Sequence, residues 1–147
     1  NFLEGVLCRV PAIFVHLPRD IQRELQWAQF VFSKDGLLLG HSKLKALWSG
    51  AKAAVLVAVT QNGLALEYVS QSLRNDLEVV EAALKQNGLA LAYAGKSFQH
   101  WAAVVRIAVK QNPYALAFSN RCYELEAAAQ KLPLPPRPQT QKATFYA

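Results

Sequence analysis

The histidines and cysteines are the residues best suited to metal binding or nucleophilic chemistry, and they lie far apart in the sequence. His16, His41 and His100 are at least 25 residues apart, so no two of them can form a helical metal-binding pair. Cys8 and Cys122 belong to no Cys-x-x-Cys motif, and we expect both to be buried structural thiols. His16 and His41 could each be an axial ligand of a metal or pigment, but packed or surface roles are commoner for single histidines. We expect His100 to be a degenerate helix cap.

Carboxylates offer the other route to catalysis, because a suitably spaced pair can act as general acid and base. At the expected helix surfaces and caps, however, ordinary solvated or capping roles are the better interpretation of the five glutamates. No glycine-rich phosphate loop and no supported Ser/His/Asp or Cys/His arrangement accompanies them. We therefore predict a non-enzymatic protein without a cofactor or metal. The glutamates are Glu67, Glu78, Glu81, Glu124 and Glu126.

Composition indicates one globular domain. The 147 residues are 52% hydrophobic and 18% charged, and the abundance of alanine and leucine favours helix. The net charge of +6 comes from 16 basic and 10 acidic residues, with the basic residues scattered along the chain. This basic protein could attract an acidic protein, an anionic membrane surface or RNA. No membrane span is expected, because the longest apolar candidate, Ala46 to Val59, is interrupted by Lys52.

A repeat with a period of 25 residues is the strongest pattern in the sequence. The tripeptides Gln61-Asn62-Gly63, Gln86-Asn87-Gly88 and Gln111-Asn112-Pro113 recur at constant spacing. Apolar residues before each tripeptide fall at i, i+3 and i+4, which predicts one buried helical face. Apolar residues after each tripeptide predict a second short helix. The first set is Val55, Ala58, Val59; Val80, Ala83, Leu84; and Val105, Ala108, Val109. The second set begins at Leu64, Leu89 and Tyr114 and ends at Tyr68, Tyr93 and Phe118, three aromatic residues that we expect in the core.

The asparagine of each tripeptide is predicted to end one helix and cap the next. Pro113 replaces glycine in the third copy and cannot adopt a positive φ, so that conformation is not required there. Pro113 would instead occupy the first helical position, after an asparagine N-cap. Asn75 and Glu78 resemble a capping box at the start of the next long helix.

The variable positions predict the outward face. Leu56 corresponds to Glu81 and Arg106, so an apolar side chain stands where the other copies carry charge. We expect the N-terminal segment or a partner to cover Leu56. Trp27, Trp48 and Trp101 do not recur between copies, and tryptophan is enriched at binding hot spots, so each is a candidate partner contact.

The flanks of the clear array are less regular. A divergent copy around Asp35-Gly36 would have its first helix from Asp20 to Ser33, with Ile21, Leu25 and Ala28 on one face. We divide the chain into an apolar N-terminal strap or short helix (1–20), a helical repeat domain (21–132) and an extended tail (133–147). The tail needs a partner to hold it, and its candidate contacts are Pro133, Pro135, Pro136, Pro138, Phe145 and Tyr146.

The second of the three clear copies resembles a known family. The segment LRNDLEVVEAALKQNGLALAYAG, from Leu73 to Gly95, is similar to the repeat pattern LxNDxEVVxAAVxxNGxALxYAS of an uncharacterised domain of unknown function. Recognisable copies run from Lys52 to Ser119, with a weaker one from Ile21 to Leu44. The resemblance implies a family common in protists and algae that also occurs in some intracellular bacteria. It implies no activity, cofactor or functional residue.

The predicted fold is therefore an all-α array of short helical-hairpin repeats, with three clear copies and one divergent N-terminal copy. The predicted function is protein–protein interaction, as an accessory or assembly subunit of a larger complex and possible peripheral component of a membrane complex. An RNA-binding helical repeat is the alternative. The corresponding residues Leu56, Glu81 and Arg106, however, share no pattern of hydrogen-bond donors and acceptors that could recognise bases. The sequence begins at Asn1 and contains no methionine, which is compatible with a processed, imported protein. By analogy with the family distribution, we favour a photosynthetic or respiratory complex in a plastid or mitochondrion.

Overall fold

The computed structural model describes residues 2–119, and all regular elements in this range are helices. They follow one recurring order: an α-helix, a 3-10 helix (η) and a short α-helix. The first three units are α1 (Phe2–Arg9), η1 (Pro11–His16), α2 (Arg19–Gln22); α3 (Leu25–Lys34), η2 (Gly36–Gly40), α4 (Ser42–Trp48); and α5 (Lys52–Gln61), η3 (Gly63–Tyr68), α6 (Gln71–Arg74). Next come α7 (Leu77–Gln86), η4 (Gly88–Tyr93), α8 (Lys96–Gln99), and finally α9 (Ala102–Gln111) with η5 (Pro113–Phe118).

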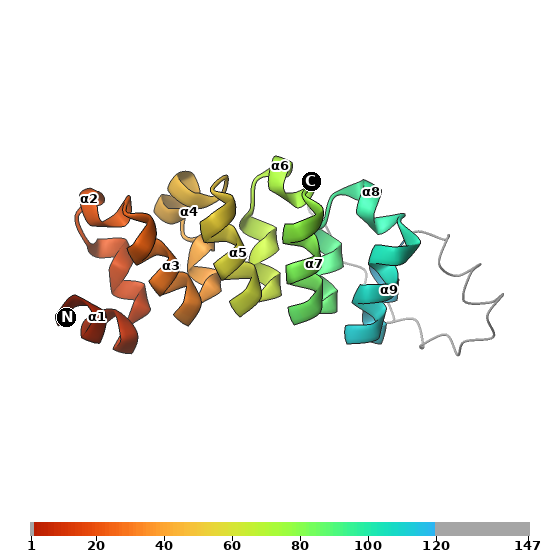
Figure 1. Cartoon of the computed structure of the whole chain (residues 1–147), viewed down its shortest axis with the longest axis horizontal. Helices are drawn as coiled ribbons and strands as arrows, with labels where there is room; N and C mark the ends of the chain where they lie inside the picture. The colour runs from red at the N-terminus through yellow and green to blue at the C-terminus, as the bar shows by residue number, and fades with distance from the viewer. Residues whose placement is uncertain (1, 120–147) are drawn as a thin grey trace, which may run out of the picture.

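The units stack side by side into an elongated row (Figure 1). Helices α3, α5, α7 and α9 pack in sequence against one another, and η2 to η5 form a second layer of neighbouring pairs. The short helices α2, α4, α6 and α8 follow one edge of the row. The predicted all-α repeat array is confirmed, and within residues 2–119 an additional short helix follows every hairpin before α9.

The N-terminal segment is also a repeat unit rather than an extended strap. The N-terminal segment was expected to be a strap or a short helix, and α1 is a short helix. The next element, η1, begins at Pro11, 25 residues before Gly36 at the start of η2. Phe14 and Val15 of η1 are buried in the core. The divergent helix predicted from Asp20 to Ser33 is wrong at its start, because α2 ends at Gln22 and α3 begins at Leu25.

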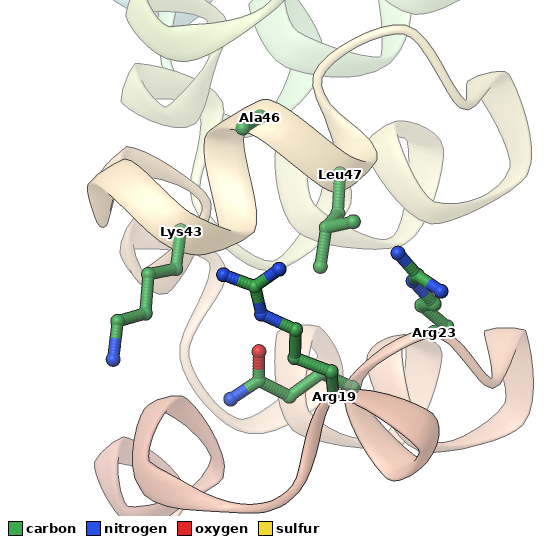
Figure 2. A pocket seen from close by; sticks show the side chains of 6 residues that line it. Arg19, Arg23, Lys43, Ala46 and Leu47 are labelled. Carbon is green, nitrogen blue, oxygen red and sulfur yellow. The ribbon is translucent and has the colours of Figure 1, made fainter.

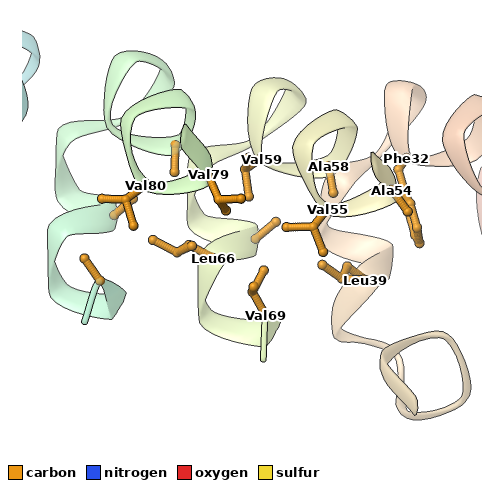
Figure 3. Packing of buried hydrophobic residues seen from close by; sticks show 14 of the residues in the cluster. Phe32, Leu39, Ala54, Val55, Ala58, Val59, Leu66, Val69, Val79 and Val80 are labelled. Carbon is orange, nitrogen blue, oxygen red and sulfur yellow. The ribbon is translucent and has the colours of Figure 1, made fainter. Parts of the chain in front are cut away.

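The core is one continuous apolar layer that passes from unit to unit. The i, i+3 and i+4 face is buried as predicted at Val55, Ala58 and Val59 and at the matching residues of α7. Figure 3 shows side chains from α5, η3 and α7 meeting in this layer. Because each unit buries its helical face only against its neighbours, stability depends on contacts between units.

Several side chains are less buried than the sequence predicted. Tyr68 and Tyr93 are half-buried at the seam, where burial and the charge of Glu67 raise the pKa of Tyr93. Phe118 was also expected in the core, but it is 42% exposed at the end of η5. Cys8 is exposed on α1, so the prediction of a buried thiol is wrong there. Leu25, predicted on the buried face of its helix, is exposed as well.

The asparagine turns fold as the sequence indicates. Asn62 ends α5, and its side-chain Oδ1 accepts a hydrogen bond from the N–H of Leu64 at 3.1 Å, capping η3. Asn87 and Asn112 do the same before η4 and η5, and Pro113 occupies the first helical position. The capping box predicted from Asn75 to Glu78 is wrong, because the helix cap lies one residue later and Glu78 pairs with Lys52. Asp76, not Asn75, is the N-cap of α7 and accepts from the N–H of Glu78 at 3.0 Å.

The glutamine before each asparagine binds the preceding unit. Oε1 of Gln86 accepts a hydrogen bond from the N–H of Gly63 at 2.6 Å, and Gln61 and Gln111 bind Gly36 and Gly88 in the same way. At Gly63, a Cβ atom would clash with the carbonyl oxygen of Ala83 in the next helix. Glycine is therefore required at this turn for close approach of the following unit and not for positive φ.

Candidate functional site

The outward surface of the long helices carries two grooves between successive units. The first lies between α5 and α7 and has a volume of about 490 Å³. Leu56 and Ala82 supply apolar surface, and charged side chains stand around them. The full lining is Leu56, Thr60, Glu78, Glu81, Ala82, Lys85 and Gln86.

Leu56 is half-buried, packs against the core and still lines this groove. The N-terminal segment does not cover it, because α1 lies at the far end of the row, with α3 between α1 and α5 (Figure 1). The other cover expected from the sequence was a partner. Leu56 therefore offers an apolar contact at the position where α7 and α9 carry Glu81 and Arg106.

One end of the groove is held by an ion-pair cluster between units. Nζ of Lys52 on α5 lies 2.8 Å from Oδ2 of Asp76 and 2.7 Å from Oε2 of Glu78. The hydrogen bond with Asp76 is the main cause of the raised pKa of Lys52, and the same bond lowers the pKa of Asp76. Both residues are therefore ionised at neutral pH and fix the start of α7 against α5.

The second groove has different chemistry. It is lined by Lys85, Ile107, Lys110 and Gln111, and its volume is about 420 Å³. Ile107 supplies the apolar contact, and neither glutamate of the first groove contributes. Lys85 borders both grooves and lies 3.7 Å from Glu81 one helical turn earlier. The scaffold thus presents an acidic groove followed by a basic one.

The three predicted tryptophans lie in different surroundings. Trp48 is only 8% exposed, and its indole N–H donates to the carbonyl oxygen of Gln22 at 2.9 Å, which is a packing role. Trp101 is 48% exposed and stacks on Phe98 with ring centroids 6.0 Å apart. Trp27 is half-buried and meets Phe30 edge to face. Trp27 and Trp101 remain available as surface contacts, whereas Trp48 does not.

Several candidates lie outside the described residues. These are the tail residues Pro133, Pro135, Pro136, Pro138, Phe145 and Tyr146, together with Cys122, Glu124 and Glu126. The predicted boundary of the repeat domain at residue 132 lies there too.

The histidines occupy recurring places in the fold. His16 ends η1 and His41 follows η2, and both positions correspond by repeat register to Tyr68. His100 ends α8, one residue before Trp101, the N-cap of α9. Within residues 2–119, no three His, Cys, Asp or Glu side chains are grouped as metal ligands would be.

The sequence did not indicate the role of the glutamines that bind adjacent units. The glutamines recur visibly in the sequence. The backbone N–H groups that they bind, however, lie 23 or 25 residues away, and no local pattern predicts such a contact. The grooves were equally hidden, because they combine side chains from two units. A comparison of outward positions between neighbouring copies, as at Leu56, is the signal that could have located them.

Among the described helices, none has the length and apolar character needed to cross a membrane. Residues 54–99 match the family described as Domain of unknown function (DUF4116). The DUF4116 match runs from within α5 to the end of α8, so it contains most of both units that form the acidic groove. It confirms the resemblance to an uncharacterised domain family. No curated protein and no solved structure matches the chain.

Proposed function

We propose that this protein is a non-enzymatic protein-binding module that serves as an accessory or assembly subunit of a larger complex. The observation that supports this is the pair of inter-unit grooves, which have the same backbone framework but different linings. A constant scaffold that presents variable surface positions is the usual way in which helical repeat proteins bind partners.

The linings define the chemistry of the partner segment. A segment across α5, α7 and α9 would place an apolar side chain against Leu56 and Ala82. It would carry acidic residues near Lys110, whereas Glu78 and Glu81 already pair with Lys52 and Lys85 of this chain. Opposite charges on the two surfaces favour one orientation and exclude segments of the reverse polarity.

The finer part of the proposal concerns the complex itself. The net charge of +6 and the distribution implied by the family resemblance lead us to propose a photosynthetic or respiratory complex of a plastid or mitochondrion. The protein would be peripheral to the membrane in such a complex.

The decisive experiment compares two single substitutions in the full chain. Leu56→Arg places in α5 the residue that α9 carries naturally as Arg106, and circular dichroism of the variant shows whether the half-buried position accepts it without loss of helix. Leu37→Arg is the matched control, because Leu37 is an exposed leucine of η2 outside both grooves. Native complexes would first be isolated with tagged wild-type protein and identified by mass spectrometry, with and without ribonuclease. The affinity of each variant for the purified partner would then be measured by calorimetry.

We expect Leu56→Arg to weaken binding by about tenfold or more, because loss of a central apolar contact typically costs at least about 1.4 kcal/mol. Leu37→Arg should bind as the wild type does. A native chain that migrates as a free monomer, or equal affinities for all three proteins, would contradict the proposal. Partners that disappear on ribonuclease treatment would favour the RNA-binding alternative.

A further inference from the structure

A pocket between the short helices α2 and α4 gathers three cationic side chains. It has a volume of about 190 Å³ and is lined by Arg19, Gln22, Arg23, Lys43, Ala46 and Leu47. Figure 2 shows the Arg19 side chain rising from α2 toward α4, with Lys43 on one side and Leu47 and Arg23 on the other. The pocket lies on the short-helix edge of the row, so it is separate from the proposed protein-binding grooves.

The pocket results from a departure from the repeat at this one junction. Between α4 and α6, the N–H of Ser70 donates to the carbonyl oxygen of Ser49 at 2.9 Å. Between α6 and α8, the N–H of Gly95 donates to the carbonyl oxygen of Arg74 at 3.0 Å. These backbone hydrogen bonds bring the short segments of adjacent units into direct contact.

At the α2–α4 junction a side chain replaces the backbone bond. The carbonyl oxygen of Gln22 corresponds to that of Arg74, and it accepts from the indole N–H of Trp48. Helix α4 has seven residues, whereas α6 and α8 have four each. The longer helix and the bulky indole therefore keep the α2 and α4 backbones from the close contact made at the later junctions, and this accounts for the pocket.

The electrostatics of the pocket favour an anion. No acidic side chain lines it, although Asp20 and Glu24 are close in sequence. Within residues 2–119, neither arginine nor Lys43 forms an ion pair. Arg19 corresponds by register to Leu44, Gln71 and Lys96, and Arg23 to Trp48, Asn75 and His100, so no later junction repeats the pair of arginines. The lining thus combines two arginines and one lysine with no carboxylate among the lining residues.

The floor of the pocket is rigid. Gln22 is 3% exposed, and its side-chain amide donates to the carbonyl oxygens of Phe14, Val15 and Leu17 at 3.2, 2.8 and 2.8 Å. These bonds tie α2 to the end of η1 and fix the backbone that carries both arginines. A fixed floor reduces the conformational entropy lost when an anion binds.

We propose that the α2–α4 pocket binds the phosphate group of a phosphate monoester. The planar guanidinium group of arginine can donate two parallel hydrogen bonds to phosphate oxygens. A dianionic phosphate also balances the charge of three cations better than a single carboxylate does. The volume is below the roughly 300–1,000 Å³ of pockets that enclose drug-sized ligands, so the pocket would hold the phosphate and leave the rest of the molecule outside. The phosphate could belong to a small metabolite or to a phosphorylated side chain.

The test is a nuclear magnetic resonance titration of the full-length protein with inorganic phosphate at constant ionic strength, using chloride as the reference anion. The indole N–H of Trp48 reports on the junction itself, and that of Trp101 is an internal reference at the other end of the array. We expect saturable shifts at Trp48 and at the amides of α2 and α4. Glycerol 3-phosphate and a phosphoserine peptide, each with its unphosphorylated form, then distinguish the two sources of phosphate.

Charge-removing variants test whether the cationic side chains of the pocket bind the phosphate. Arg19→Gln with Arg23→Gln should weaken phosphate binding by about tenfold or more, because charge-assisted hydrogen bonds are lost. Lys43→Gln tests the third cation from the other helix. Arg9→Gln with Lys96→Gln removes the same number of charges outside the pocket and both grooves, and should leave phosphate binding unchanged. Absence of saturable shifts in the wild type, or equal affinity of both double variants, would overturn the proposal.

Discussion

Gly63→Ala tests whether close approach between units, and not turn conformation, fixes the glycine of the repeat. The φ angle of Gly63 lies outside the left-handed region, so alanine is compatible with the backbone itself. The added Cβ would however clash with the carbonyl oxygen of Ala83 and lie 3.1 Å from Oε1 of Gln86. Because the clash is with backbone of the next helix, α5–η3 and α7 must move apart to relieve it.

The cost follows from overpacking of a tightly apposed interface. We expect a loss of about 2–3 kcal/mol in the free energy of unfolding, the upper part of the roughly 1–3 kcal/mol typical when an extra group is forced into a packed site. For a protein of this size that corresponds to a fall in Tm of roughly 4–12 °C. The movement would also weaken the hydrogen bond between Gln86 and Gly63, so we expect the loss of stability to lie near the upper end of this range.

The assay is urea unfolding followed by circular dichroism, with Gly50→Ala as the matched control. A Cβ at Gly50 meets only the hydroxyl of Ser70, at 4.0 Å, so this variant should be neutral or slightly stabilised. Equal stabilities for the two variants would refute the close-approach explanation. A Gly63→Ala protein more stable than the wild type would refute it as well.

Three further predictions use the same unfolding assay. Gln86→Leu should cost about 1–3 kcal/mol by leaving the buried N–H of Gly63 without an acceptor, and Gln86→Glu, which retains an acceptor, should cost less; equal losses would contradict this. Gly5→Ala should stabilise the protein by about 0.5–1 kcal/mol, because Gly5 is helical with open space around its Cβ position, and any loss would contradict the α1 assignment. Asp76→Asn keeps a capping side chain but removes the charge. Since Lys52 lowers the pKa of Asp76 below 3.8, the variant should be less stable than the wild type above that pH. The difference should vanish as the pH falls through the lowered pKa, and a difference that persists in acid would exclude the ion pair as its cause.

The sequence predicts the long helices and the asparagine turns well because both depend on local chemistry. The buried face of α7 follows from the spacing of Val80, Ala83 and Leu84, and the cap at Asn87 depends on residues two positions apart. The four-residue helices could not be predicted in the same way, because one turn has no usable periodicity.

The N-terminal unit shows why divergent copies escape prediction. Val10 stands where the other units have asparagine or aspartate, and Pro11, like Pro113, stands where the remaining units have glycine, so the diagnostic tripeptide is absent. The 25-residue spacing from Pro11 to Gly36, and the buried Phe14 at the place of Leu39, were the remaining signals. For the candidate sites, the sequence identified Leu56 but neither groove, because each groove depends on the packing of two units.

Hydrogen–deuterium exchange on the native complex, compared with the free full-length protein, tests the proposed function most directly. The account predicts protection on complex formation in α5 around residues 56–60 and in α7 around residues 78–86, with little change in η2. Protection confined to other parts of the array, or exchange rates identical in the free and bound protein, would contradict binding through the grooves.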